Sequence, residues 1–139
     1  MTHNKPVDEL TILSGIQYYK QNTWVKAEGE IVRVGITDFA INQFGTIIFI
    51  ELPQVGEFFN QGEVFGVSEL GAKSTLALYM PLSGEIESVN NEVSDSPDNV
   101  YTDPYGIGWM ITIKPRDLNE LSNLLSKDEY ISLLKKSLK

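Results

Sequence analysis

The chain is organised around residues 66–84, which read Gly66-Val-Ser-Glu-Leu-Gly-Ala-Lys-Ser-Thr-Leu-Ala-Leu-Tyr-Met-Pro-Leu-Ser-Gly84. Two apolar, alternating runs meet in this stretch, at residues 64–67 and 75–80, and a few small or polar residues with a glycine separate them. Two strand-like runs joined in this way are typical of a β-hairpin. We therefore expect Lys73 at the hairpin tip, in water.

Lys73 stands alone as a positive charge in this part of the sequence. Between Gly35 and Ile113 the chain carries eleven acidic residues, and its one basic residue is Lys73. A lysine in a turn is most often only a solubilising surface residue. The isolation of Lys73 nevertheless indicates that it does not belong to a general basic face. The hairpin residues around it are Glu69, Leu70, Gly71, Ala72, Ser74 and Thr75.

Length and composition favour one domain over residues 1–139, located in the cytoplasm. A chain of 139 residues can bury roughly two-thirds of the surface that it exposes when unfolded. It contains no cysteine, which excludes disulfides, thiolate metal ligands and cysteine nucleophiles. No apolar run has the length of a membrane span, and the N-terminus lacks the hydrophobic segment of a secretory signal.

The charge balance bears on the kind of partner. The formal net charge is −8, and nucleic acids and anionic membranes require a basic binding surface, so neither is an expected partner. Proteins with basic docking surfaces fit better. No interface pattern is visible in the sequence, and we expect a monomer.

The segments before the hairpin alternate between strand and helix patterns. Residues 1–10 are expected to form a mobile polar lead, and the apolar residues 10–19 to pack along the body. The following segments are expected to be, in order, strands at 23–27 and 31–36, a helix at 39–44 that Thr37 or Asp38 caps and Gly45 ends, and a largely buried strand at 46–52.

The segments after the hairpin predict a closing strand and helices at the C-terminus. Residues 90–106 are rich in turn signals, and residues 108–114 alternate as a strand does. Residues 117–120 and 126–129 both have the cap-x-x-Glu signature, so residues 117–137 are expected to be helices packed on the β body. The expected architecture is therefore many short strands around one core.

Two short pieces flank the hairpin symmetrically and resemble each other. They are Gln61-Gly-Glu-Val64 and Ser83-Gly-Glu-Ile86, and each has a turn glycine, an acid and a β-branched residue. A sandwich with pseudo-twofold symmetry would produce such a repeat, but a match of four residues is weak evidence for the symmetry by itself.

No part of the sequence predicts a self-sufficient active site. The only histidine, His3, lies in the polar lead without partners. The acidic pairs Asp95/Asp98 and Glu85/Glu87 match no calcium-loop pattern and read as solvated surface. We therefore expect neither catalytic residues nor a metal site.

Several separated motifs resemble the H protein of the glycine cleavage system. They are Trp24-Val-Lys-Ala-Glu-Gly29, Val34-Gly-Ile-Thr-Asp-Phe-Ala40, Gly45-Thr-Ile-Ile-Phe-Ile-Glu-Leu-Pro-Gln-Val-Gly56, Pro81-Leu-Ser-Gly-Glu-Ile86 and Asp103-Pro-Tyr-Gly-Ile-Gly-Trp-Met-Ile-Thr-Ile-Lys114. In that family a lipoyl-lysine stands eight residues before the proline of a Pro-x-Ser-Gly segment. Counted back from Pro81, that position is Lys73.

The resemblance implies a fold and a function. The fold would be a barrel-sandwich hybrid with short peripheral helices and C-terminal helices. The protein would be a non-catalytic carrier with lipoic acid joined covalently to Lys73. Its arm would take an aminomethyl group from a pyridoxal-phosphate glycine decarboxylase to a tetrahydrofolate-dependent aminomethyltransferase, and a flavin-containing dihydrolipoamide dehydrogenase would reoxidise it. A lipoate ligase or lipoyl transferase would install the cofactor.

The residues around Lys73 depart from the family pattern. Residues 70–72 replace the usual Glu-Ser-Val, and residues 74–77 replace Ala-Ala-Ser-Asp. The usual His-Glu before the first tryptophan is Asn22-Thr23, and Gly-Glu-Gly-Trp is residues 106–109, Gly-Ile-Gly-Trp. Two alternatives therefore stay open: a lipoate-binding paralogue that serves sulfur oxidation or lipoyl relay, and an unlipoylated interaction protein.

Overall fold

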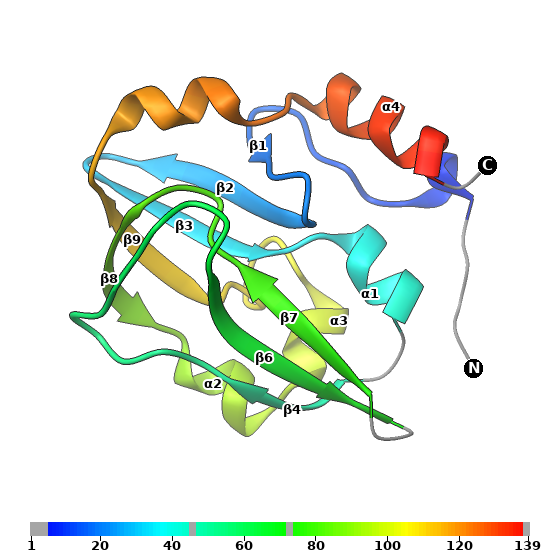
Figure 1. Ribbon diagram of the computed structural model, residues 1–139. Helices are drawn as coiled ribbons and strands as arrows, with labels where there is room; N and C mark the ends of the chain where they lie inside the picture. Colours follow the sequence, from blue (N-terminus) through cyan, green and yellow to red (C-terminus); the bar gives the residue numbers. More distant parts are fainter. Residues whose placement is uncertain (1–5, 45–46, 72–73, 138–139) are drawn as a thin grey trace.

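The computed structural model describes residues 6–44, 47–71 and 74–137. Over these residues the strands form two antiparallel sheets, neither closed into a barrel (Figure 1). The larger sheet has the order β1-β2-β3-β9-β8-β5, with β1 Gln17–Tyr18, β2 Thr23–Glu28, β3 Ile31–Ile36, β9 Ile111–Pro115, β8 Gly84–Val89 and β5 Phe58–Phe59. The smaller has the order β4-β6-β7, with β4 Ile47–Glu51, β6 Val64–Leu70 and β7 Thr75–Tyr79. The expected mainly β, barrel-sandwich class is confirmed.

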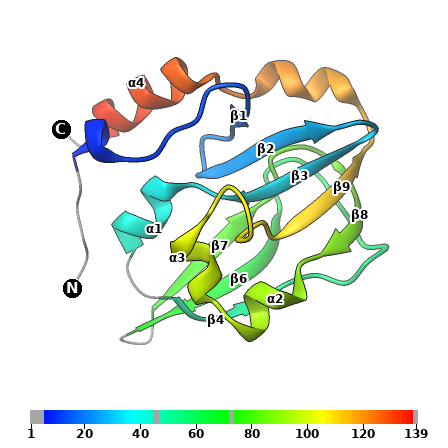
Figure 2. The ribbon, with the colours of Figure 1, turned by 180° about the vertical axis from the view of Figure 1, so that it is seen from behind.

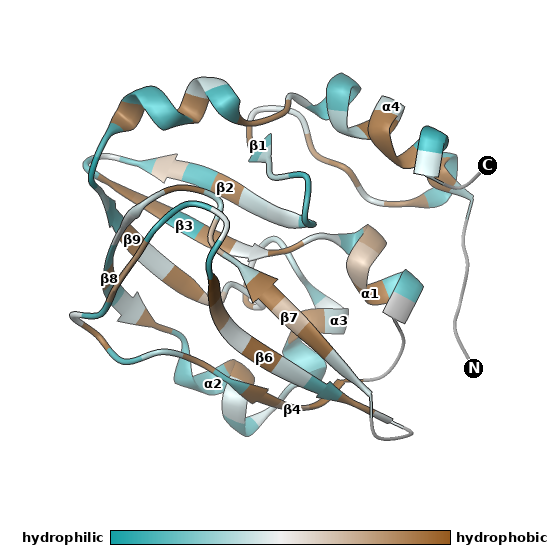
Figure 3. Ribbon diagram, viewed as in Figure 1, coloured by the Kyte–Doolittle hydropathy of each residue, from teal (hydrophilic) through white to brown (hydrophobic). Residues whose placement is uncertain are grey.

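The main hydrophobic core lies between the two sheets. Strands β3 and β9 of the larger sheet contribute Val34 and Ile113, and strands β6 and β7 of the smaller contribute Phe65 and Leu78, all in one cluster of buried side chains. Hydrophobic residues occur along the strands of both sheets, as the brown segments of the ribbon show (Figure 3). Strand β6 comes near the period-two pattern of a strand with one buried face, since Phe65, Ser68 and Leu70 are buried while Val64 and Glu69 are exposed.

A second, smaller core joins both ends of the described chain to the larger sheet. The rings of Tyr18 and Tyr130 stack with centroids 4.6 Å apart, and Leu10 and Leu134 are buried beside them. The Tyr130 hydroxyl donates to Asn22 Oδ1 at 2.8 Å. Of the expected mobile lead, residues 1–5 and with them His3 lie outside the described residues, while Val7–Glu9 form a 3₁₀ turn, η1, that contacts α4.

Five further helices surround the sheets: α1 Asp38–Phe44, α2 Asn91–Asp95, α3 Asp98–Thr102, η3 Leu118–Asn123 and α4 Lys127–Ser137. Helix α2 contacts β4 and α3, and α3 contacts α1 (Figure 2). The capping box of α4 is confirmed, because Glu129 N donates to Ser126 Oγ at 3.2 Å and Ser126 N donates to Glu129 Oε1 at 2.9 Å. None of the helices in the described part of the chain has the length and apolar character that a membrane span requires.

Three expectations for secondary structure need correction. Residues 90–106 were expected to be turns, but they contain α2 and α3, and the Asn90 side chain starts α2 by accepting from Glu92 N. The closing strand begins at Ile111 instead of residue 108, because Gly108 N and Trp109 N are used in turn hydrogen bonds to Asp103 and Gly106. The segment capped by Asp117 is helical as expected, but of the 3₁₀ type.

A fourth correction concerns β4, which was expected to be largely buried. Ile48 is 60% exposed and Phe49 is 48% exposed, while Ile47 and Ile50 are buried. A β-bulge in the pairing of β4 with β6 between Ile47 and Phe49 places two successive residues at the surface. The apolar run of β4 is therefore buried at Ile47 and Ile50 and exposed to solvent at Ile48 and Phe49.

Candidate functional site

The hairpin expected from the sequence is formed by β6 and β7. Their register pairs Glu69 with Thr75 and Val67 with Ala77. Leu70 N donates to Ser74 O at 2.9 Å and closes the turn. The predicted attachment residue Lys73 and its neighbour Ala72 lie outside the described residues, so the position of Lys73 stays a prediction.

Of the described residues in and beside the turn, one is buried in the core and the others are exposed to solvent. Leu70 is 5% exposed and belongs to the main core. Gly71, Ser74 and Thr75 are exposed, as is Glu69. The Ser74 hydroxyl donates to Gly71 O at 3.2 Å. Leu70, one of the residues in which the chain departs from the family pattern, therefore fixes the turn to the body.

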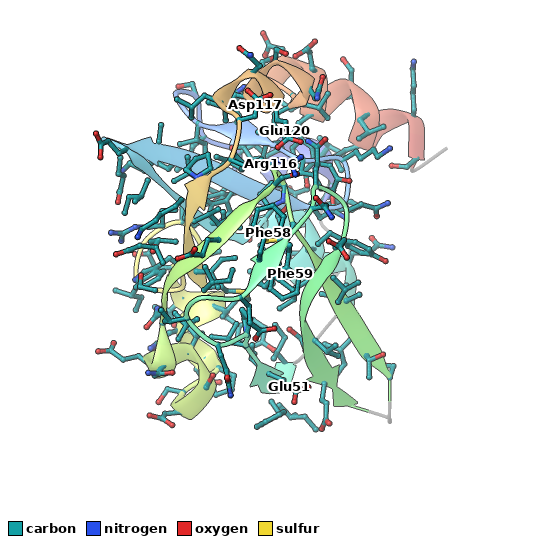
Figure 4. The ribbon with its side chains drawn as sticks, turned by 60° about the vertical axis from the view of Figure 1, so that its left-hand side comes forward. Glu51, Phe58, Phe59, Arg116, Asp117 and Glu120 are labelled. Atoms are coloured by element: carbon teal, nitrogen blue, oxygen red, sulfur yellow. The ribbon has the colours of Figure 1, made fainter. Side chains whose placement is uncertain are left out.

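The base of the hairpin is held by a carboxylate that the sequence analysis did not single out. Glu120 in η3 accepts hydrogen bonds from Ser83 N at 2.7 Å and from Ser83 Oγ at 3.0 Å. Arg116 N donates to Ser83 O at 3.0 Å, and the Arg116 guanidinium lies 5.5 Å from the centre of the Phe58 ring. Figure 4 shows Glu120 and Arg116 in the upper part of the molecule, Phe58 below them near its middle, and Glu51 toward the opposite end. Because 37 residues separate Ser83 from Glu120, no local pattern reveals this contact.

Two further hydrogen bonds fasten the same end of the hairpin. Gln61 N donates to Ser83 Oγ at 2.8 Å, and Gln61 Nε2 donates to Pro81 O at 2.8 Å. The two similar pieces noted in the sequence thus touch each other. Their glycines differ in conformation, because Gly62 has φ +88° in a turn, whereas Gly84 begins β8.

The outer face of the smaller sheet presents acids beside apolar side chains. The register places Phe49 of β4 beside Glu69 and then Thr75, and it places Glu51 beside Val67 and then Ala77. We call these six residues the hairpin face. Phe49, Glu51, Glu69 and Thr75 are exposed, and Val67 and Ala77 are half-buried.

A surface pocket of about 390 Å³ lies where three distant segments meet. Phe39 and Gln43 come from α1, Leu133 from α4, and Lys20 and Asn22 from the turn between β1 and β2. Its described lining contains one cation, four amide or hydroxyl side chains and no carboxylate: Lys20, Gln21, Asn22, Gln43 and Ser137 are the polar members. The pocket thus combines three apolar side chains, Phe39, Leu133 and Leu134, with a polar lining that offers no negative charge to a cation.

The described titratable groups whose pKa is clearly shifted are all tyrosines. Within residues 6–44, 47–71 and 74–137, no three histidine, cysteine, aspartate or glutamate side chains gather where they could hold a metal ion. The most perturbed groups are tyrosines of the second core: burial raises the pKa of Tyr105 and of Tyr130. Both hydroxyls already serve structural hydrogen bonds, Tyr105 to Thr11 O and Tyr130 to Asn22.

Comparison with known proteins decides the family. Residues 16–137 match the family model of the glycine cleavage H-protein. The chain belongs to the glycine cleavage H-protein family. A glycine cleavage system H protein of Anoxybacillus flavithermus is 42% identical over 125 residues, which cover 90% of this chain and 98% of that protein. One from Carboxydothermus hydrogenoformans is 45% identical over 119 residues, 86% of this chain and 91% of that protein.

A solved structure of the family agrees with the fold. The crystal structure of a glycine cleavage system H protein from Mycobacterium marinum matches with a TM-score of 0.80 and 34% identity, covering 89% of this chain and 99% of that one. These relatives carry the glycine cleavage name, so the comparisons favour a role in that system over the two alternatives that the altered hairpin had left open.

Proposed function

We propose that the chain is the lipoyl carrier of a glycine cleavage system, with lipoic acid in amide linkage to Lys73. The observation that carries the proposal is the combination of family membership with the β6–β7 hairpin, in whose turn the sequence places Lys73. The described neighbours fit such an attachment, because Gly71, Ser74 and Thr75 are exposed and leave room for a modifying enzyme. We propose no catalytic residue in this chain.

The lipoyl group, when bound, supplies a disulfide that accepts and releases a substrate fragment, so the chemistry belongs to the cofactor and to the partner enzymes. The chain supplies a stiff platform. Leu70 anchors the tip in the core, and Glu120 holds the base through Ser83. A short tether raises the effective concentration of the carried group at the next site to roughly millimolar.

The partners that we propose are those of the glycine cleavage system. They are the pyridoxal-phosphate glycine decarboxylase, the aminomethyltransferase and dihydrolipoamide dehydrogenase, together with a lipoate ligase or lipoyl transferase. The eleven acidic residues between Gly35 and Ile113 favour enzymes with basic rims. The monomeric state stays a prediction.

We also propose that the pocket between α1 and α4 receives the arm when no partner is bound. Helix α1, which contributes Gln43, ends only a few residues before Ile47, and Ile47 pairs with Leu70 at the tip. The chain from Gln43 to Ile47 can span at most about 14 Å. Gln43, at the edge of the pocket, therefore lies within that distance of Ile47 in β4. The unloaded arm is uncharged, and the described lining holds no carboxylate that would favour a cationic guest over it.

The pocket proposal has a spectroscopic test. Amide resonances of the unmodified and the lipoylated protein should differ at the tip and also at Phe39, Gln43 and Leu133. Ile107, an exposed apolar residue that does not line this pocket, is the internal control. Differences restricted to residues 69–76 would contradict a resting place for the arm in this pocket.

The carrier proposal is tested by mass and then by function. The protein is coexpressed with lipoate and a ligase that accepts ordinary H proteins, beside a Lys73→Arg control. We expect the mass of one lipoyl amide on the native chain and none on the control. The lipoylated protein should then support exchange of bicarbonate into glycine by glycine decarboxylase. Modification of the Lys73→Arg control would overturn the site, and modified protein without exchange would overturn the glycine cleavage role.

A further inference from the structure

The geometry points to the hairpin face as the docking surface of the enzyme that acylates Lys73, an enzyme that presents an apolar contact surrounded by basic residues. This inference rests on the proposed function. It adds a named surface, a partner of stated chemistry and the residues that recognise it.

The apolar part of the surface comes from β4. Phe49 of the hairpin face and its neighbour Ile48 are successive large apolar residues, 48% and 60% exposed. Single exposed apolar residues are ordinary, whereas a contiguous apolar patch marks an interaction site. Half-buried Val67 and Ala77 continue the patch across β6 and β7. The bulge that exposes both β4 residues gives the patch a defined structural origin.

The location of the patch favours an enzyme that acts at Lys73. Phe49 pairs with Glu69, and Glu69 pairs with Thr75, so the row runs across the sheet next to the turn that contains Lys73 in the sequence. Figure 1 shows β4, β6 and β7 converging on this corner, away from α4. A protein seated on the hairpin face therefore lies beside the turn.

The charge of the face defines the partner. Glu51 and Glu69 are exposed there, and Lys73 is the only basic residue between Gly35 and Ile113. Before acylation, the two carboxylates of the face already outnumber the single lysine charge of the turn. A partner with lysine or arginine around its apolar contact is electrostatically complementary to this arrangement.

The acylating enzyme needs this contact more than the enzymes that use the finished arm. In acylation, lysine Nζ attacks the carbonyl of an activated lipoyl donor, either an acyl adenylate or an acyl thioester. The C–N amide bond forms, the bond to the adenylate or thiolate breaks, and the amine loses a proton. The reacting atom is then one lysine side chain away from the backbone, so the enzyme must approach the hairpin body. The later enzymes react at the far end of a much longer arm.

The test compares two phenylalanines of equal exposure. Phe49 and Phe58 are both 48% exposed, but Phe58 lies on β5 in the other sheet. We expect Phe49→Ala to raise the KM for the unmodified carrier by roughly five- to thirtyfold in acylation by a purified lipoate ligase, with kcat unchanged, because truncation of an interface anchor costs this much. Phe58→Ala should change KM less than twofold. Thermal unfolding checks that both variants are folded.

Each other outcome overturns the inference. Equal effects of the two substitutions would mean that the hairpin face is not selected by the ligase. A raised KM only with glycine decarboxylase or the aminomethyltransferase would assign the face to a client enzyme. A change of oligomeric state in Phe49→Ala would assign it to self-association. Failure of the carrier proposal itself is distinguishable, since the ligase would then leave native and variant chains unmodified alike.

Discussion

At the scale of single residues, the chain uses a few long-range polar contacts to hold the platform of the hairpin. Ser83 is 1% exposed and has both of its donors bonded to the Glu120 carboxylate. A buried donor left without a partner costs free energy beyond the loss of the bond itself. The hairpin base therefore depends on a side chain that lies outside both sheets.

Removal of this carboxylate should destabilise the fold. We expect Glu120→Ala to lower the free energy of unfolding by about 1.5–3 kcal/mol, the range for hydrogen bonds to a charged group. Glu63→Ala is the matched control, because Glu63 also accepts a backbone N–H, from Asn60 at 2.6 Å, but in an exposed turn. Its cost should stay below about 1 kcal/mol in the same urea titration. Equal decreases in the free energy of unfolding for the two variants would mean that the buried Ser83–Glu120 contact stabilises the fold no more than an exposed turn contact.

The buried tyrosines predict instability at alkaline pH. Burial raises the pKa of Tyr105 and of Tyr130 well above the ordinary value of a tyrosine. Such a tyrosine stays neutral in the folded state but ionises near pH 10 in the unfolded state. The folded protein therefore keeps its full stability below pH 10 and loses stability as the pH rises above 10. Each such group changes the free energy of unfolding by about 1.4 kcal/mol per pH unit in that window. Tyr130→Phe should lessen the slope between pH 10 and 12 by this amount, and an unchanged slope would show that Tyr130 ionises in the native state.

At the scale of helices and strands, local patterns predicted most elements because the determining interactions are local. The glycine-containing turn between β6 and β7, the Thr37 end of α1 and the Ser126 box of α4 all depend on residues within a few positions of each other. The exposure of Phe49 was missed, since a bulge depends on the partner strand. The short helices α2 and α3 were also missed, because both lie in a stretch rich in turn residues, where Asn90 caps α2 and Pro97 precedes α3.

The α4 capping box gives a quantitative test at this scale. We expect Ser126→Ala to lower the free energy of unfolding by about 1 kcal/mol, because the Glu129 N–H loses its acceptor. Ser132→Ala, at an exposed position in the interior of the same helix, should be neutral or slightly stabilising, since alanine has the higher helix propensity. Equal destabilisation by the two substitutions, measured by chemical denaturation, would contradict a working cap.

At the scale of the whole molecule, the features that the sequence could not predict are those that distant segments form together. The barrel-sandwich class followed from the resemblance and from strand patterns along the chain. The pocket joins residues near 20, 40 and 133, and the Ser83–Glu120 contact joins the hairpin to η3. Neither can be seen without the fold. The hairpin face needs the register of three strands as well as the distribution of charge.

The distribution of charge yields a final prediction about encounter with the ligase. The net charge of −8 acts on every basic partner, but only Glu51 and Glu69 lie on the hairpin face. Near physiological ionic strength, charges more than about 8 Å from a contact are largely screened, so the local pair should dominate the salt dependence. We expect Glu51→Gln/Glu69→Gln to raise the KM of acylation at low salt and to flatten its increase with added salt. The matched double variant, Glu9→Gln/Glu30→Gln, removes the same charge from exposed positions in η1 and in the β2–β3 turn, and it should retain the native salt dependence. Equal flattening in both double variants would mean that overall charge, rather than the hairpin face, steers the enzyme.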